Sequence, residues 1–250
     1  MKALVRRPSP RLGDGIVTHL DRRPVDLERA REQWRGYVRA LEDAGWEAVE
    51  APPADDCPDG VFVEDAVLGY GEVAIVTRPG AAARRVELRG VAQAVAELGY
   101  RVERIEAPAT LDGGDVLRIR DHVYVGRSSR TNAEGARQLR RLLTPLGATV
   151  TEVPVENVLH LKSAITALPD GTIVGYAPRV PPFFRDFLSM PEESGAQLVL
   201  LGGGKVMLAA DCPRSAELIA ARGYDPVPVD ISEFQKLEGC VTCLSVRLPG

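Results

Sequence analysis

Two thiols near the C-terminal end of the sequence have a spacing that can do chemistry. Cys240 and Cys243 stand three residues apart, and such a pair can bind zinc or close a redox disulfide. A structural zinc site needs a second pair of ligands, whereas the three histidines and the other two cysteines are widely scattered. The surrounding run has the composition of a strand, in which residues three apart point to opposite faces. At most one of the two sulfurs is then expected to face a given site, and the spacing alone favours two small core residues.

A histidine and several carboxylates form a second set of candidates. His160 lies in an apolar segment, where a single histidine is more often a hydrogen-bonded core residue than a catalyst. The Asp-Gly-Gly-Asp motif at 112–115 has a turn composition that is common in solvated loops. Glu64 and Asp65 are adjacent in an expected apolar strand, so one of them must face the covered side and needs a cation or hydrogen-bond donors there.

These residue types indicate more in combination than any of them does alone. A cysteine, a histidine and an acid suit nucleophilic attack by a thiolate on a planar, cationic carbon. A guanidinium contains such a carbon, and carboxylates near strand ends would bind its nitrogens. The combination therefore favours a reaction at an amidine.

Composition and charge limit the class of protein. The 250 residues carry 31 Lys and Arg against 35 Asp and Glu, and this net charge of −4 does not provide the overall basic surface that nucleic acids favour. The longest uncharged run, residues 194–204, has eleven residues, whereas a membrane-spanning helix needs about 20 apolar ones. The first residues lack the pattern of an export signal, so a cytoplasmic protein is expected. With 45% apolar residues, the chain is expected to bury its core without disulfides or a structural metal.

Strand-like and helical patterns recur in a fixed order along the chain. Residues 61–105 predict strand, strand, helix and strand, with the helix at 83–98, and residues 115–153 predict the same order with the helix at 132–146. Five units of about 50 residues, the last shared between the two termini, predict a closed ring and not a row of domains. The remaining units are a third copy at 163–201 with a short helix at 183–188, a degenerate fourth at 206–229, and a fifth that joins 242–248 to the strands at 3–6 and 47–50 and the helix at 26–44.

Six segments of the chain carry a family resemblance. They are residues 58–65, 77–85, 111–116, 126–132, 159–163 and 238–245. In these motifs and their order, the sequence resembles the dimethylarginine dimethylaminohydrolase family of the pentein (amidinotransferase-like) superfamily. The resemblance implies an α/β fold, namely a five-bladed ββαβ propeller with pseudo-five-fold symmetry, formed by one catalytic domain (1–250) with its active site in the central channel. It also implies a small-molecule substrate and a homodimer, with no cofactor, metal, nucleic acid or membrane involved.

The resemblance assigns a triad to Cys243, His160 and Asp112. Cys243, in a Thr-Cys-x-Ser context, would be the nucleophile, and Cys240 would be a neighbour without a catalytic role. His160 would protonate the departing amine and then activate water, while Asp112 would orient the imidazolium. We also expect a bound guanidinium to favour ionisation of the Cys243 thiol. The implied substrate-binding residues are Asp65 and Glu64 for the guanidinium, Arg84 and Arg130 for the carboxylate, Asp59 for the α-amino group, and Ile16 and Leu237, which would close the site from a lid and from the opposite side.

Lys162 discriminates between related activities. The resemblance implies that arginine deiminases of the superfamily carry an acid two residues after the histidine, where this chain has a lysine. The site then has one carboxylate fewer to bind unsubstituted nitrogens, so Nω-methylated arginine is the first expected substrate. The expected reaction gives citrulline and dimethylamine or methylamine through a Cys-linked thiouronium. Free arginine or another substituted amidine is the second. Two other classes are a non-catalytic propeller that binds a partner, which would not need the triad, and a zinc-binding CxxC module, which the expected strand geometry disfavours.

Overall fold

Residues 1–248, which the computed structural model describes, form an α/β structure with five three-stranded sheets. The sheets are β15-β1-β2, β3-β4-β5, β6-β7-β8, β9-β10-β11 and β12-β13-β14. Their strands are β1 (Lys2–Val5), β2 (Glu47–Glu50), β3 (Val67–Tyr70), β4 (Val73–Val76), β5 (Arg101–Arg104), β6 (Val116–Ile119), β7 (His122–Arg127), β8 (Thr149–Pro154), β9 (Ile165–Ala167), β10 (Ile173–Gly175), β11 (Leu188–Ser189), β12 (Val199–Gly202), β13 (Lys205–Ala209), β14 (Asp225–Val229) and β15 (Ser245–Leu248).

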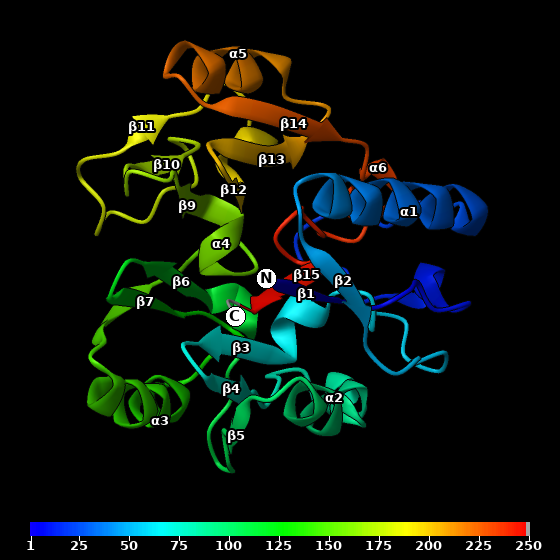
Figure 1. Cartoon of the computed structure of the whole chain (residues 1–250), viewed down its shortest axis with the longest axis vertical. Coiled ribbons are helices and arrows are strands. Elements are labelled where there is room, and N and C mark those ends of the chain that lie inside the picture. The colour runs from blue at the N-terminus through cyan, green and yellow to red at the C-terminus, as the bar shows by residue number, and fades with distance from the viewer. Residues whose placement is uncertain (249–250) are drawn as a thin grey trace.

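All five sheets share one pattern of strand pairing. The first strand of each sheet runs antiparallel to the middle strand, and the middle strand runs parallel to the third. The two ends of the chain build one sheet together, because Lys2 to Val5 of β1 pair with Leu248 to Ser245 of β15. Figure 1 shows the sheets set around a common centre, close to which β1 and β15 lie. The predicted completion of one unit by the two termini is confirmed.

In four of the units that the structure describes, a helix links the middle strand to the third. These helices are α1 (Leu27–Asp43), α2 (Val91–Glu97), α3 (Ala133–Leu143) and α5 (Pro213–Ala221), and Figure 1 shows them outside the sheets. The side chain of Asp26 caps α1 and that of Asn132 caps α3, each accepting a backbone N–H of the first helical turn. The predicted helix at 132–146 continues from α3 through a 3₁₀ turn and stops at Gly147, which has a φ of 89°.

The unit β9-β10-β11 departs from the predicted order. Its residues 176–187 form turns and bends, so the helix predicted at 183–188 is wrong. A segment of six residues barely exceeds one helical turn, which is too short for a helix to sustain itself. Phe183 and Phe184 instead pack edge-on against Tyr124 of β7, with ring centroids 6.2 and 5.2 Å from the tyrosine ring.

Two further predicted elements are interrupted by tight turns. The helix expected at 83–98 is a 3₁₀ helix (Ala82–Leu88) and α2, separated by Gly90 with a φ of 74°. The strand expected at 61–68 begins only with β3, because Val63–Asp65 form a 3₁₀ helix. The two 3₁₀ helices carry the expected site residues Arg84, Glu64 and Asp65, whose backbone therefore leaves the regular repeat.

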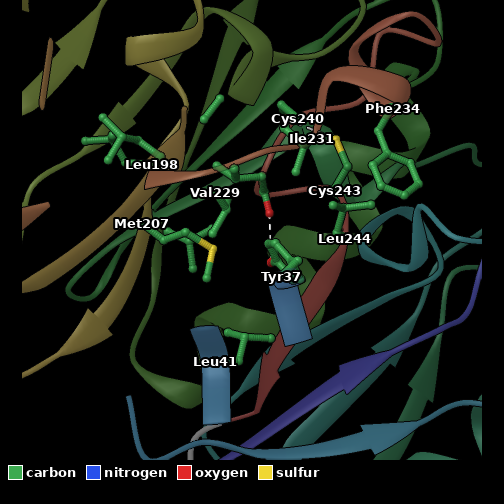
Figure 2. Close-up of a cluster of buried hydrophobic side chains, with 14 of the residues drawn as sticks. Tyr37, Leu41, Leu198, Met207, Val229, Ile231, Phe234, Cys240, Cys243 and Leu244 are labelled. Atoms are coloured by element: carbon green, nitrogen blue, oxygen red, sulfur yellow. Dashed lines mark hydrogen bonds between the residues drawn. The ribbon is translucent and has the colours of Figure 1, made fainter. Parts of the chain in front are cut away.

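The largest apolar cluster joins α1, the β12-β13-β14 sheet and the turn that carries Cys240 and Cys243 (Figure 2). Tyr37 of α1 is fully buried, and its hydroxyl donates to the carbonyl of Val241 at 2.8 Å and lies 2.7 Å from Oγ of Ser245. Helix α1 therefore holds the cysteine-bearing turn in place from the outside of the sheets.

A cavity of about 250 Å³ lies between the first strands of the five sheets. Residues of β3, β6, β9, β12 and β15 line it, together with Glu64 and Lys162. None of the helices within residues 1–248 has the length and apolar character that a membrane crossing requires.

Candidate active site

His160 and Asp112 form a buried pair. His160 lies directly before the short helix α4 (Leu161–Ala164), and its Nε2 is 3.0 Å from Oδ2 of Asp112. Asp112 is fully buried and His160 is 3% exposed, so water screens their interaction little. The other oxygen of Asp112 accepts the N–H of Gly80 at 2.8 Å. The imidazole is thus oriented by a carboxylate that the backbone itself holds in place.

Neighbouring carboxylates keep His160 protonated. Burial alone would lower its pKa, but the charge of Asp65, the hydrogen bond to Asp112 and the charge of Asp115 raise the pKa of His160 to about 9. Oδ1 of Asp65 is 3.9 Å from Nε2. At neutral pH the ring is therefore an imidazolium, which can donate a proton.

The Asp-Gly-Gly-Asp motif at 112–115 is buried, so its interpretation as a solvated loop is wrong. A Cβ on Gly114 would lie 2.5 Å from Nδ1 of His160, and a Cβ on Gly113 would collide with the carbonyl oxygen of Glu64. The N–H of Gly114 donates to Oδ1 of Asp65 at 2.8 Å. The two glycines let the turn approach the histidine and the carboxylates closely enough to bond them.

Asp65 is an ionised carboxylate in the core. Burial by itself would raise its pKa, but the charges of His160 and Arg84 hold the pKa of Asp65 well below its usual value. Nη1 of Arg84 donates to Oδ2 of Asp65 at 2.6 Å, while Nε and Nη2 donate to the carboxylate of Glu87. The resemblance assigns Arg84 to a substrate carboxylate, whereas this guanidinium is bound to two carboxylates of the protein and only 5% of the residue is exposed.

Glu64 has a different partner from its neighbour Asp65. Its Oε1 accepts from Nζ of Lys162, and both side chains are more than nine-tenths buried. Burial raises the pKa of Glu64, and the charge of Lys162 partly offsets this effect. The strand expected for these two acids is wrong, because Val63–Asp65 form a 3₁₀ turn that buries both side chains. Lys162 balances Glu64, which leaves Asp65 as the carboxylate beside His160.

Cys240 and Cys243 lie on one tight turn, and the strand geometry predicted for them is wrong. The N–H of Cys243 donates to the carbonyl of Cys240 at 3.1 Å, so the chain turns before β15 begins. The two sulfurs are 3.2 Å apart instead of on opposite faces. The carbonyl of Cys243 accepts the N–H of Glu64 at 3.2 Å, which ties this turn to the carboxylate segment.

The two thiols share a hydrogen bond and titrate as a pair. The hydrogen bond from Cys243 lowers the pKa of Cys240, while the same bond, together with burial, raises the pKa of Cys243 well above its usual value. Cys240 is 2% exposed and Cys243 is 9% exposed, and Figure 2 shows both beside Phe234 in the apolar core. Ionisation of Cys243 therefore calls for a cation in the site.

The backbone of Ile16 is bonded to one of the expected substrate ligands. Its N–H donates to both carboxylate oxygens of Asp59, at 3.1 and 3.2 Å. Burial raises the pKa of Asp59, against the charge of Arg84. Leu237 and Asp59 both lie next to Gly15, the residue before Ile16. A Cβ on Gly15 would be 3.4 Å from Cδ1 of Leu237 and 2.9 Å from Oδ1 of Asp59. The structure thus brings Ile16, Asp59 and Leu237 together.

Residues 14–19 are the segment expected to form the lid, and its last two residues, Thr18 and His19, are bonded to Arg130 and Glu238. Nη2 of Arg130 donates to Oγ1 of Thr18 at 3.2 Å, and the carboxylate of Glu238 accepts the N–H groups of Thr18 and His19 at 2.8 and 2.5 Å. A cavity of about 910 Å³ adjoins them, with walls that include His19, Glu238 and Leu159, the residue before His160. The segment expected to form the lid is thus bonded to Asp59 and Arg130, two of the expected substrate-binding residues.

Four polar residues support the site although the sequence analysis gave them no role. They are Tyr37, Glu87, Asp115 and Glu238. Asp115 is fully buried, and burial raises its pKa to about 6. Its two oxygens accept the N–H of Leu161 at 2.9 Å and the hydroxyl of Ser128 at 2.5 Å, which ties the segment of His160 to that of Arg130. Asp115 belongs to the Asp-Gly-Gly-Asp motif at 112–115, so the sequence draws attention to it. Its supporting role depends on burial, which only the folded structure reveals. Tyr37 has the spacing of any apolar residue on an amphipathic helix and gives no separate signal.

Asp65, Asp112 and His160 also have the spacing of a metal site. One ligand atom from each lies within 4.8 Å of the others. A metal ligand must be a neutral imidazole, whereas the carboxylates around His160 favour its protonated form. The arrangement suits proton transfer and the binding of an organic cation better than it suits a metal ion.

Comparison with known proteins identifies relatives over nearly the full length. A Streptomyces coelicolor protein named N(G),N(G)-dimethylarginine dimethylaminohydrolase is 61% identical over 249 residues, covering 99% of this chain and 96% of the relative. A Pseudomonas aeruginosa protein of the same name is 40% identical over 250 residues, covering 98% of each. A mutant of the Pseudomonas aeruginosa enzyme, solved in complex with citrulline, is 38% identical and superposes with a TM-score of 0.92, covering 99% of this chain and 98% of that one. No protein-family model matches the chain. The identity and coverage of these relatives show that the chain belongs to the dimethylarginine dimethylaminohydrolase family.

Proposed function

We propose that the protein hydrolyses Nω-methylated arginine, releasing citrulline with dimethylamine or methylamine through a thiouronium intermediate on Cys243. The observation that carries this proposal is the imidazolium of His160, bonded to Asp112 beside the ionised carboxylate of Asp65. It combines a proton donor with an anion suited to a guanidinium. The names of the two relatives refer to dimethylarginine, and the solved relative binds citrulline, the product of the proposed reaction.

In the first half of the reaction, Asp65 binds the guanidinium and the thiolate of Cys243 attacks its central carbon. The bond from this carbon to the methylated nitrogen breaks as His160 gives its proton to the departing amine. Because the pKa of Cys243 is raised in the free protein, the substrate's own positive charge is needed to favour the thiolate.

In the second half, the neutral imidazole of His160 removes a proton from water, and the water oxygen attacks the thiouronium carbon. The carbon–sulfur bond breaks and Cys243 leaves as a thiolate. The second proton of the water passes to solvent, where the released amine takes it up, and the carbonyl of citrulline is formed. The proton taken from water restores the imidazolium. Asp112 orients the ring in both halves, as the third member of a triad does.

The amino-acid end of the substrate is assigned to Arg130, Asp59, Ile16 and Leu237. The guanidinium of Arg130 suits a carboxylate, and the carboxylate of Asp59 suits an α-amino group. Both now bond the lid segment, so a bound substrate would replace or adjoin these bonds. Arg84 acts through Asp65, because its N–H groups already bind Asp65 and Glu87.

The preference for methylated nitrogens is assigned to the ion pair of Lys162 and Glu64. Lys162 stands where a further carboxylate would bind an unsubstituted nitrogen, and it engages Glu64 as well. Asp65 is then the one carboxylate of the 64–65 pair that is left for the guanidinium. A methylated nitrogen has fewer N–H groups than an unsubstituted one, so it leaves fewer hydrogen bonds unmade in such a site.

The five sheets are interpreted as the blades of one propeller in a single catalytic domain, with the active site in its central channel. The shared strand pairing, the blade built by both termini and the cavity lined by all five first strands support this interpretation. The four cysteines are free thiols, the state that the cytoplasm maintains, which supports a cytoplasmic protein. The homodimer stays a prediction, for which sedimentation analysis is the test.

A substrate comparison tests the proposed function. The protein is incubated separately with asymmetric dimethylarginine, monomethylarginine and arginine, and citrulline is measured together with the amine or ammonia released. We expect the highest kcat/KM for a methylated substrate. Citrulline formed mainly from arginine would support the deiminase alternative, and no citrulline from any of the three would support another amidine substrate or a binding role.

A further inference from the structure

Cys240 is a buried thiol that the proposed reaction does not use. Its sulfur lies 3.2 Å from Sγ of Cys243 and 3.2 Å from Oγ1 of Thr242, and it is 2% exposed. Figure 2 shows it in the same apolar cluster as Cys243, on the turn that leads into β15. The catalytic sulfur therefore has a second thiol in van der Waals contact.

The turn gives the two cysteines the geometry that a disulfide requires. The N–H of Cys243 donates to the carbonyl of Cys240, and a turn closed in this way keeps its end Cα atoms within about 7 Å. Disulfides join Cα atoms that are about 4.4–6.8 Å apart. The sulfurs are 3.2 Å apart, whereas a bond needs about 2.05 Å, so side-chain rotation by a small angle brings them together.

The other two cysteines are placed differently. The thiol of Cys212 donates to the carbonyl of Ala209 at 2.9 Å, and Cys57 belongs to a separate turn closed by Gly60. Both are buried thiols. They are matched controls for the pair at 240 and 243.

We propose that Cys240 and Cys243 form an oxidation site for small hydroperoxides, in which Cys240 is the resolving thiol and the resulting disulfide reversibly inactivates the enzyme. The proposal rests on the assignment of Cys243 as the nucleophile, because the thiolate that attacks a guanidinium carbon also attacks a peroxide oxygen. Hydrogen peroxide is close to water in size, and Cys243 is 9% exposed.

The chemistry balances in two steps. The raised pKa of Cys243 makes its thiolate a minor species in the free protein, and this minor species attacks one oxygen of hydrogen peroxide. A sulfur–oxygen bond forms, the oxygen–oxygen bond breaks, and hydroxide leaves and takes up a proton as water. This sulfur is oxidised by two electrons and the peroxide is reduced. The thiolate of Cys240 then attacks the sulfenic sulfur; the disulfide forms and a second water leaves. In sum, two thiols and one hydrogen peroxide give one disulfide and two waters.

The contact between the sulfurs has two functional consequences. In the disulfide, Cys243 has no thiolate to attack the substrate, so turnover stops. Because Cys240 is already in contact, it traps the sulfenic acid before a second peroxide converts it irreversibly to sulfinic acid. A dithiol reductant reverses the disulfide by thiol exchange and restores the nucleophile.

The digestion pattern of the chain gives a direct readout. Trypsin cuts after Lys236 and Arg247, so both cysteines fall on the single peptide 237–247. An internal disulfide lowers the mass of this peptide by two hydrogens, whereas an overoxidised cysteine raises it by oxygens. This readout needs no substrate, so its outcome is independent of the proposed function.

Three reduced proteins are treated with hydrogen peroxide: the wild type, Cys240→Ser and the control Cys57→Ser. The remaining thiols are then blocked, and dithiothreitol is added to half of each sample. For wild type and Cys57→Ser we expect peptide 237–247 to lose two hydrogens, activity to fall more than about tenfold from each protein's own untreated rate, and both changes to reverse. For Cys240→Ser we expect oxygen addition at Cys243 and an activity loss that dithiothreitol restores less completely as the exposure lengthens.

Oxygen addition to the wild-type peptide without loss of hydrogens would overturn the proposal, as would full recovery of Cys240→Ser after long exposure. Because the wild-type peptide alone decides the first point, a variant that fails to fold does not remove the test. A protein that forms the disulfide but releases no citrulline from any arginine derivative would refute the proposed function and leave the oxidation site standing.

Discussion

Nε2 of His160 lies 3.0 Å from Oδ2 of Asp112, and the second oxygen of this carboxylate is fixed by the backbone N–H of Gly80. The pair is buried, and burial alone would lower the pKa of His160, but the charge of Asp65, the hydrogen bond to Asp112 and the charge of Asp115 raise this pKa to about 9. The fold therefore supplies a histidine that stays protonated at neutral pH and whose orientation does not depend on solvent.

Asp112→Asn tests this relationship through the pH profile. The change removes a negative charge and an acceptor that favour the imidazolium, so the pKa of His160 should fall from about 9 toward the ordinary value of about 6.5. We expect kcat to fall about 10²- to 10⁴-fold and the loss of activity at high pH to begin at lower pH. The exposed Asp186 provides the control Asp186→Asn. An unchanged alkaline limb in Asp112→Asn would contradict the assigned role.

Lys162→Met should destabilise the protein because it leaves the buried carboxylate of Glu64 without its cation. Removal of one partner of a buried ion pair costs about 3–5 kcal/mol, whereas removal of both charges costs much less. We therefore expect a lower free energy of unfolding in urea for Lys162→Met and a substantial recovery when Glu64→Gln is added. Equal stability of the single and double variants would show that the ion pair is not the cause.

Gly114→Ala should remove activity without unfolding the protein. A methyl group at this position would lie 2.5 Å from Nδ1 of His160, so the ring or the turn must move, and catalytic geometry tolerates little displacement. We expect kcat to fall at least about 100-fold. The matched control is Gly36→Ala, because Gly36 lies inside α1 and a Cβ there would meet only Nη2 of Arg39, at an ordinary contact distance of 3.9 Å. Alanine at this position should stabilise the helix by up to about 1 kcal/mol. Similar kcat values for both variants would refute this explanation of Gly114.

Glu238 holds the lid segment from a strained backbone conformation. Its φ is 61°, a region that costs a non-glycine residue about 1 kcal/mol or more, and its carboxylate accepts the N–H groups of Thr18 and His19. Glu238→Ala and Glu238→Gly both remove the carboxylate, so both should raise KM more than they lower kcat. Glu238→Gly should be the more stable of the two by about 1 kcal/mol in urea unfolding. A fall in kcat alone would indicate a role in the chemical step instead of the lid.

The regular part of the fold could be predicted from the sequence because it follows from periodic patterns. The strands around α3, the stop at Gly147 and the pairing of β1 with β15 follow from local composition and from the order of the repeat. The short helix expected at 183–188 failed because packing of Phe184 against Tyr124 outweighs a weak local preference.

The sequence indicates the expected catalytic residues only as separate motifs. What joins Asp65 to Gly114 and Asp112 to His160 is contact between segments that are far apart in the chain, which no periodic pattern encodes. The wrong strand assignment of Cys240 has the same origin. The apolar run predicts an extended strand, whereas its residues turn and bond Glu64 of another unit and Tyr37 of α1, which are both far away in the chain.

The central claim is that Cys243 is the nucleophile for a methylated arginine, and product stoichiometry in cysteine variants tests it most directly. Wild-type protein, Cys243→Ser and Cys240→Ser are incubated with asymmetric dimethylarginine under reducing conditions, and citrulline and dimethylamine are both quantified. The account predicts equal amounts of the two products from wild type, continued release of both from Cys240→Ser, and none from Cys243→Ser. Turnover by Cys243→Ser, or its loss in Cys240→Ser alone, would contradict the account.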